Sequence, residues 1–188
     1  AKSQLNSAKS QLESSQKALQ EQQSSTASEL AQTSKAVDAA VATQSAYNAQ
    51  LAGLQASKLA LETEKKAYTD AGIEAQYEQI NESFASVRNM ASGYGMDASA
   101  YPADISDALK SPKKLEALTA FMKQIGQSDA AASLTMDNLK QLDQIVNTRL
   151  PQIDTELANL AVEIQAAQAI ADQVNEQVKA ATDNYEAL

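Results

Sequence analysis

The strongest constraint on this sequence is an uninterrupted heptad pattern that runs from Leu150 to Leu188. Apolar residues recur there at alternating steps of three and four, as on the a and d positions of a coiled coil. The predicted seam consists of Leu150, Ile153, Leu157, Leu160, Ile164, Ala167, Ala171, Val174, Val178, Ala181, Tyr185 and Leu188. A lone helix with so narrow an apolar seam is unstable in water, so this segment requires a partner helix.

A second heptad register runs from Leu5 to Tyr68, and it is more polar. Its d positions are Leu5, Leu12, Leu19, Thr26, Thr33, Ala40, Tyr47, Leu54, Leu61 and Tyr68. Its a positions are Lys2, Lys9, Gln16, Gln23, Leu30, Val37, Gln44, Leu51, Lys58 and Lys65. Polar a positions weaken association and fix register or partner number. We therefore expect this arm to pair less tightly than the last one.

Each register contains one irregularity. At residues 70–72 the first register breaks, because the next apolar series restarts out of phase. That series is Ile73, Tyr77, Ile80, Phe84 and Val87. Two consecutive steps of four end at Leu150 and form a stutter, with Pro151 directly after it. The two irregularities face each other if the arms are antiparallel, which makes Gly72 and Pro151 candidate hinges.

Residues 89–135 have a different composition from the rest of the chain. Only 4% of the sequence is aromatic, yet both Phe and all four Met fall within 84–136. Gly93 or Gly95 is expected to end the preceding helix in a left-handed conformation. Helix starts are predicted at Tyr101–Pro102, at Ser111–Pro112 and between Asp129 and Thr135, with a stop at Gly126. The segment is therefore predicted to form a head of two or three short helices.

These observations predict an all-α fold, a long antiparallel coiled-coil hairpin with a small helical head inserted at its tip. Residues 1–88 form the first arm, 89–135 the head and 136–188 the returning arm. The first arm is the longer one, so about 35 residues at its N-terminus are expected to lack a partner within the hairpin. They would pair with a second copy, as a homodimer through residues 1–35, with sequence beyond Leu188, or fray.

The composition argues against an enzyme and against a cofactor or metal site. There is no His and no Cys, which removes the commonest general base, zinc ligands and thiol nucleophiles. The carboxylate pairs Asp104–Asp107 and Glu62–Glu64 are interpreted as solvated faces. A net charge of −9 argues against nucleic acid or an anionic membrane as the main partner.

No targeting signal in the sequence indicates a particular class of protein. The sequence contains neither a signal peptide nor an apolar run long enough to insert in a membrane. It starts in mid-heptad and stops on a seam position, so we expect it to be part of a longer protein.

The head contains two candidate interaction features. Lys110, Lys113, Lys114 and Lys123 form a basic group that would contact an anionic polymer or partner; the plainer reading is that they aid solubility. Met90, Tyr94, Met96, Tyr101 and Met122 form either an adaptable binding surface or, as such residues more often do, the core of the head. The predicted interaction surface is Tyr94, Met96, Tyr101, Lys110, Lys113, Lys114 and Lys123.

The stretches AKSQLNSAKSQLESSQKAL and AVATQSAYNAQLAGLQASKLALE resemble the Ala-, Gln- and Ser-rich coiled coils of Gram-positive cell-surface and cell-wall proteins. The sequence is similar to surface-exclusion proteins and to the coiled-coil domains of secreted peptidoglycan hydrolases. The resemblance implies an extracytoplasmic location, at the cell surface or in the cell wall, and implies that any enzymatic domain is separate. The absence of Cys is compatible with that location.

Two functions are consistent with this pattern. The first is a non-enzymatic stalk that presents the head to another protein or to a cell-surface component of the bacterial envelope. The second is a regulatory arm of an envelope machine, a wall hydrolase or a secretion complex, in which hinges at Gly72 and Pro151 transmit a conformational change.

Overall fold

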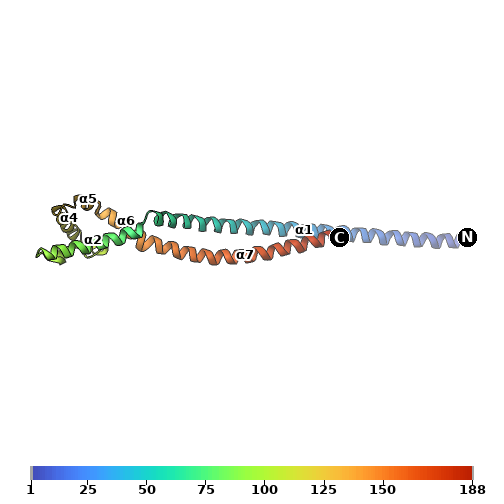
Figure 1. The fold of residues 1–188 in the computed structure, drawn as a ribbon. Coiled ribbons are helices and arrows are strands. Elements are labelled where there is room, and N and C mark those ends of the chain that lie inside the picture. Colours follow the sequence, from blue (N-terminus) through green and yellow to red (C-terminus); the bar gives the residue numbers. More distant parts are fainter. Residues whose placement is uncertain (1, 188) are drawn as a thin grey trace. The chain divides into compact units, whose positions relative to one another are not determined.

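The computed structural model describes residues 2–187, and every regular element in that range is a helix (Figure 1). The α-helices are α1 (Lys2–Asp70), α2 (Ile73–Gly93), α3 (Ile105–Lys110), α4 (Pro112–Gln124), α5 (Ser128–Ser133), α6 (Met136–Gln144) and α7 (Leu150–Glu186). A 3-10 turn, η1 (Ala98–Ala100), precedes α3, and a π-helical turn, η2 (Ile145–Arg149), joins α6 to α7. The predicted all-α fold class is confirmed.

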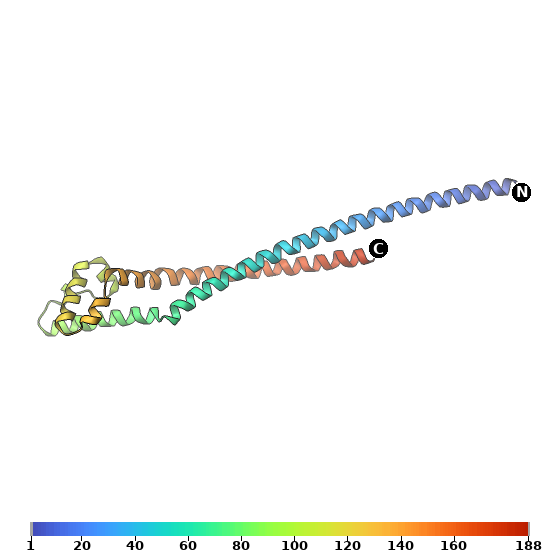
Figure 2. The same cartoon turned by 90° about the horizontal axis from the view of Figure 1, so that it is seen from above.

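The chain divides into two compact units. The arm unit comprises the residues up to Ala56 and those from Val162 onwards, and the head unit comprises Ser57–Ala161. In the arm unit α1 and α7 run antiparallel and side by side (Figures 1 and 2). In the head unit α1 contacts α7 again, where Lys65 meets Asp154. Each unit therefore contains the antiparallel helix pair expected of the hairpin. The predicted boundaries after residues 88 and 135 stay a prediction.

Burial along α7 follows the predicted seam closely. Leu150, Ile153, Ala167, Ala171 and Val174 are buried. The remaining predicted positions as far as Ala181 are partly buried. The prediction fails at Tyr185, which is 42% exposed because it lies in the last turn of α7. Leu188 lies outside the described residues.

Exposure along α1 changes sharply at Thr33. Every described residue before it is exposed, whereas the a and d positions from Thr33 to Tyr68 are partly buried. No residue of α1 is fully buried. Residues 2–32 are thus exposed, which is consistent with the expectation for the N-terminal part of the first arm.

The two predicted irregularities lie against each other within the head unit. The first is the break between α1 and α2, where Gly72 has φ 66° and ψ 32°. This left-handed conformation is inexpensive only for glycine. The second is η2, whose π turn accommodates the extra residue of the stutter before Pro151. Gly72 and Leu150 line the same groove, so the breaks face each other as the antiparallel pairing required.

Local capping explains the short helices of the head. Ser111 caps α4 by accepting a hydrogen bond from the Lys114 amide, with Pro112 in the first turn, as predicted. Gly95 (φ 78°) and Gly126 (φ 83°) provide the left-handed turns that follow α2 and α4. The helix expected to open at Tyr101–Pro102 begins later, at Ile105. The extended Asp104 caps it, so that prediction was wrong by one helical turn.

Candidate functional site

The head has a well-packed apolar core. It is assembled from α2, α3, α4, α5 and α6 and from the loop residues Tyr101 and Leu134. Its members are Phe84, Val87, Ala91, Tyr101, Ile105, Ala108, Leu115, Leu118, Phe121, Met122, Ala131, Leu134 and Leu139. The predicted face of the restarted series, including Phe84 and Val87, supplies the α2 side of this core. A rigid platform of this kind fixes the positions of the loops and side chains on its surface.

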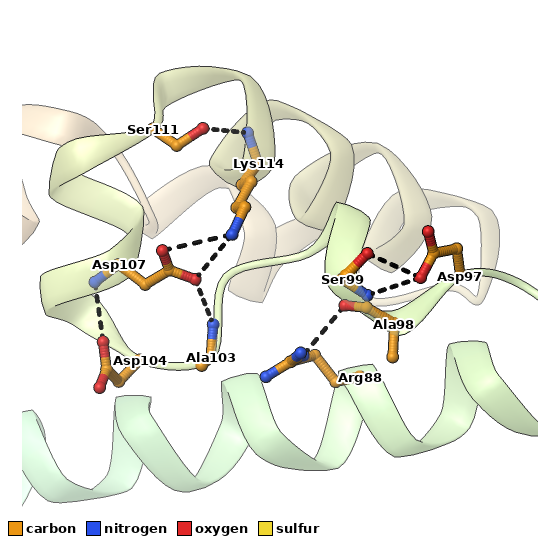
Figure 3. A network of polar contacts seen from close by, with 9 residues as sticks. All are labelled: Arg88, Asp97, Ala98, Ser99, Ala103, Asp104, Asp107, Ser111 and Lys114. Atoms are coloured by element: carbon orange, nitrogen blue, oxygen red, sulfur yellow. Dashed lines mark hydrogen bonds and ion pairs between the residues drawn. The ribbon is translucent and has the colours of Figure 1, made fainter.

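A network of polar contacts fixes the connection between α3 and α4 (Figure 3). The Asp107 carboxylate accepts a hydrogen bond of 3.0 Å from the Ala103 amide and forms an ion pair of 3.2 Å with Lys114 Nζ. Asp104 Oδ1 accepts a bond of 2.7 Å from the Asp107 amide. The Ala103 amide and the Lys114 ammonium hold the pKa of Asp107 below its usual value. The Asp104–Asp107 pair is therefore a helix cap with an ion pair, more structured than the solvated face predicted for it.

The same view contains a second contact, which fixes η1. Asp97 Oδ1 accepts hydrogen bonds from the Ser99 hydroxyl at 2.8 Å and from the Ser99 amide at 3.0 Å. These bonds lower the pKa of Asp97. Arg88 Nε on α2 donates to the Ala98 carbonyl at 3.0 Å, which ties the loop to the helix (Figure 3). The loop between α2 and α3 is thereby held on the platform.

Three large apolar side chains remain exposed where α2 meets this loop. Tyr94 is 70% exposed, Met96 41% and Met90 38%. We call these residues the head patch. Buried aromatic rings support it: the Tyr94 ring meets Phe121 edge-on at a centroid distance of 6.3 Å, and Tyr101 lies 5.8 Å from Phe121. The Tyr101 hydroxyl donates to Met96 Sδ at 3.4 Å.

The predicted Met and Tyr set therefore divides between surface and core. Tyr101 is only 8% exposed and Met122 3%, so both belong to the core. Tyr101 is corrected from a surface residue to a support of the head patch.

The four predicted lysines are distributed over two helices. Lys110 ends α3, Lys113 and Lys114 lie in the first turn of α4, and Lys123 lies in its last turn. The first and last turns of α4 are about 15 Å apart along the helix axis. Lys114 is also occupied by its ion pair with Asp107. Lys110, Lys113 and Lys114 therefore lie near the junction of α3 and α4, and Lys123 lies at the far end of α4. The basic interaction surface stays a prediction.

A second candidate site lies beside the predicted hinge Gly72 and next to Leu150, the residue before the predicted hinge Pro151. A groove of about 320 Å³ opens beside Gly72, and its lining includes Lys65, Tyr68, Leu150 and Asp154. Lys65 Nζ lies 2.6 Å from Asp154 Oδ1 across this groove. The Asp154 carboxylate raises the pKa of Lys65. Charges on α1 and α7 thus hold the two helices together beside the break.

A bidentate ion pair lies next to this groove. Arg149 donates from Nε to Glu64 Oε1 at 2.7 Å and from an η nitrogen to Oε2 at 2.6 Å. Its other η nitrogen lies 3.6 Å from Glu156. The guanidinium lowers the pKa of Glu64, and the carboxylate raises that of Arg149. Paired hydrogen bonds of this kind fix orientation as well as charge.

Three polar side chains from α2, α6 and η2 also meet in the head unit. Asn147 Nδ2 donates to Asp143 Oδ1 at 2.8 Å and to the Tyr77 hydroxyl at 3.0 Å. Asn147 belongs to η2 and Tyr77 to α2. The π turn is therefore held to the opposite helix by hydrogen bonds.

The sequence interpretation missed most of these contacts. Glu64 was assigned to a solvated face, and no role was predicted for Arg149. One signal was available: Arg149 is the lone Arg of the returning arm, at the point where the two irregularities were expected to meet.

Within residues 2–187 no group of three or more acidic, His or Cys side chains is arranged to hold a metal ion. Among the helices described, none combines the length and the apolarity that crossing a bilayer requires. Comparison of the chain with protein families, with curated proteins and with solved structures finds no match.

Proposed function

We propose that this chain is a non-enzymatic coiled-coil stalk that presents its helical head to another protein or to a cell-surface component. The observation that carries the proposal is the head patch. Met90, Tyr94 and Met96 are all exposed where α2 meets the following loop, next to a well-packed core. Exposed Met and Tyr side chains suit binding because the first adapt in shape and the second combine apolar area with a polar tip.

The proposed setting is extracytoplasmic, at the surface or in the wall of a Gram-positive bacterium. It rests on the resemblance of the arms to the coiled coils of such proteins and on the absence of Cys. The proposed partners are an envelope protein or another surface component, together with a second copy of the chain bound through residues 1–35.

The test is a binding assay on intact Gram-positive cells and on their isolated walls. The chain is labelled through one introduced cysteine, since it has none of its own. Replacing Met90, Tyr94 and Met96 together by Ser is expected to weaken binding about tenfold or more. The matched control is Val162→Ser, which removes a residue 67% exposed in the arm unit. Equal binding by the patch variant, or no binding by the unaltered chain, would refute the proposal.

A second function is favoured by the groove at Gly72. A left-handed glycine and a π turn face each other there, and two ion pairs join the helices beside them in addition to the buried Leu150 and Ile153. Such a junction suits a regulatory arm that changes shape within a wall hydrolase or a secretion complex.

Gly72→Ala and Pro151→Ala test this alternative by stiffening the two candidate hinges. The readout is wall hydrolysis and secretion by cells that carry each variant as the sole copy. Reduced activity at normal protein levels supports the regulatory role, and unchanged activity counts against it.

A further inference from the structure

The N-terminal part of α1 carries an apolar seam that is exposed throughout. Its leucines, Leu5, Leu12, Leu19 and Leu30, are 71%, 70%, 66% and 42% exposed. They lie one heptad apart except for Leu30, which occupies an a position. A shallow groove runs along part of this face. We call residues 2–33 the free seam.

A parallel pairing of two copies is unfavourable on this seam. It would place each a position opposite its own copy, so that Lys9 would face Lys9 and Lys2 would face Lys2. The neighbouring e and g positions offer no carboxylate that would compensate both layers, because Glu13 would face Ala8. Two layers of like charge would then lie within the interface.

An antiparallel pairing removes this conflict, because each a position then faces a d position of the partner. Each antiparallel register can be named by the sum of the numbers of two residues that face each other. In the register with a sum of 35, Leu5 faces the second copy's Leu30. Leu12 faces Gln23 and Leu19 faces Gln16 of that copy. The long stems of Gln and Lys cover leucine while their polar ends reach solvent.

Charge selects the same register. It places Lys9 beside Glu29 of the second copy, and two-fold symmetry forms that ion pair twice. The register displaced by one heptad, with a sum of 28, would place Glu13 beside Glu13 of the other copy. The sum of 35 also covers the whole free seam, from Lys2 to Thr33, where exposure ends.

We infer that the free seam is a homodimerisation site in which a second copy binds antiparallel, with the two-fold axis between Lys17 and Ala18. The occupant is another copy because two-fold symmetry forms both the Leu5–Leu30 layer and the Lys9–Glu29 ion pair twice, while the remaining layers pair Leu with Gln and Thr with Lys. This dimer deepens the homodimer named under the proposed function and is independent of what the head patch binds. Cell binding and dimer geometry can therefore fail separately.

Spin-label distances test the orientation and the register together. Ser7 and Ser28 occupy outward-facing f positions and are equidistant from the inferred axis. The chain lacks Cys, so Ser7→Cys and Ser28→Cys each introduce a single labelling site in the full chain. The inferred register predicts the same axial separation for both labels, about 32 Å at 1.5 Å per residue.

Other arrangements give different results, and each would overturn the inference. A parallel dimer gives short distances for both labels. The register with a sum of 28 gives about 21 Å for position 7 and about 42 Å for position 28. Absence of any distance, with a monomer in sedimentation, means that another partner or none occupies the seam.

A charge placed on the seam provides the functional control. Leu12→Lys is expected to weaken dimerisation about tenfold or more in sedimentation equilibrium. Leu59→Lys is the matched control, because Leu59 is 65% exposed and lies at a b position outside both seams. Equal weakening by both substitutions would show that charge alone, and not the seam, opposes association.

Discussion

The head unit and the arm unit stabilise their helices with different side chains. In the head unit Phe84, Ile105, Leu118 and Leu139 are completely buried. In the arm unit the buried residues of α7 are small, Ala167, Ala171 and Val174, and α1 contributes none. The hydrophobic free energy of burial rises with apolar area, so the head unit gains more per residue. The more stable unit is therefore the one that carries the exposed head patch. The seam of the arm unit is packed more weakly.

The largest expected effect comes from removing a core ring. Phe84→Ala should lower the free energy of unfolding of the head unit by about 3–5 kcal/mol, because a large cavity is left at a residue with 0% exposure. Val174→Ala in the arm unit should cost only about 1–2 kcal/mol, the value of two buried methyl groups. Urea unfolding followed by hydrogen exchange of each unit measures both.

Leu59→Ala is the control for this pair, since Leu59 is 65% exposed. Its effect should stay within about 0.5 kcal/mol. A loss for Val174→Ala as large as that for Phe84→Ala would contradict the proposed difference between the units.

Two glycines provide the next largest contrast. Gly72→Ala should destabilise the head unit by about 1–2 kcal/mol, because its φ of 66° is unfavourable for any residue with a Cβ. Gly53→Ala lies within helix α1, where alanine is favoured, and should stabilise the arm unit by about 1 kcal/mol. An added Cβ meets nothing within 4 Å at either position, so the backbone alone sets the sign. Thermal unfolding that shifts in the same direction for both would contradict this.

The position of Gly72 in the structure shows what could be predicted from the sequence, and the tyrosines of the head show what could not. Gly72 was located because it interrupts a repeating heptad register. Such a repeat, and a break in it, can be recognised from the sequence without knowledge of tertiary contacts. The seam of α7 and the cap at Ser111 were predictable for the same reason. The burial of Tyr101 and the exposure of Tyr94 were not predictable. Both tyrosines follow the end of α2, and only their packing against Phe121 in the folded protein decides which one is buried.

The cross-helix ion pairs were equally hidden. Glu64 meets Arg149 because η2 alters the phase of the helix by an extra residue, which rotates Arg149 toward α1. A heptad diagram assumes constant phase and cannot predict this. The failure at Tyr185 has the opposite cause, since the periodicity continues there while the helix ends.

A smaller difference between the units should appear on acidification. Folding lowers the pKa of Glu64 from 4.5 and that of Asp107 from 3.8. The unfolded chain therefore takes up protons first as the pH falls, and the stabilisation present above these values is lost as the pH passes through the lower, folded values. The effect is moderate because the Glu64 and Asp107 side chains are 33% and 30% exposed.

Glu64→Gln and Asp107→Asn check this assignment. Each should lower the melting temperature near neutral pH and flatten its decline as the pH falls below the ordinary carboxyl pKa values of 4.5 and 3.8. A decline as steep as that of the unaltered chain would show that other carboxylates cause it.

The smallest expected effect concerns the polar contact of the arm unit. Gln44 Nε2 donates to Asn175 Oδ1 at 2.7 Å, across α1 and α7. Both groups are neutral, so this contact does not respond to pH, and its exposure limits its contribution. Gln44→Ala should change the free energy of unfolding by less than about 0.5 kcal/mol. Gln44→Leu should instead stabilise by about 1 kcal/mol, because an a position gains apolar area.

The two substitutions separate stability from register at this position. A polar residue at one a position fixes alignment at a cost in stability. Gln44→Leu should therefore raise the melting temperature while hydrogen-exchange protection around Asn175 becomes more uniform along α7, as alternative alignments become populated. If Gln44→Leu destabilises the arm unit, the hydrogen bond contributes to stability. The arm would then depend on a specific polar contact, as the head unit does at Arg149.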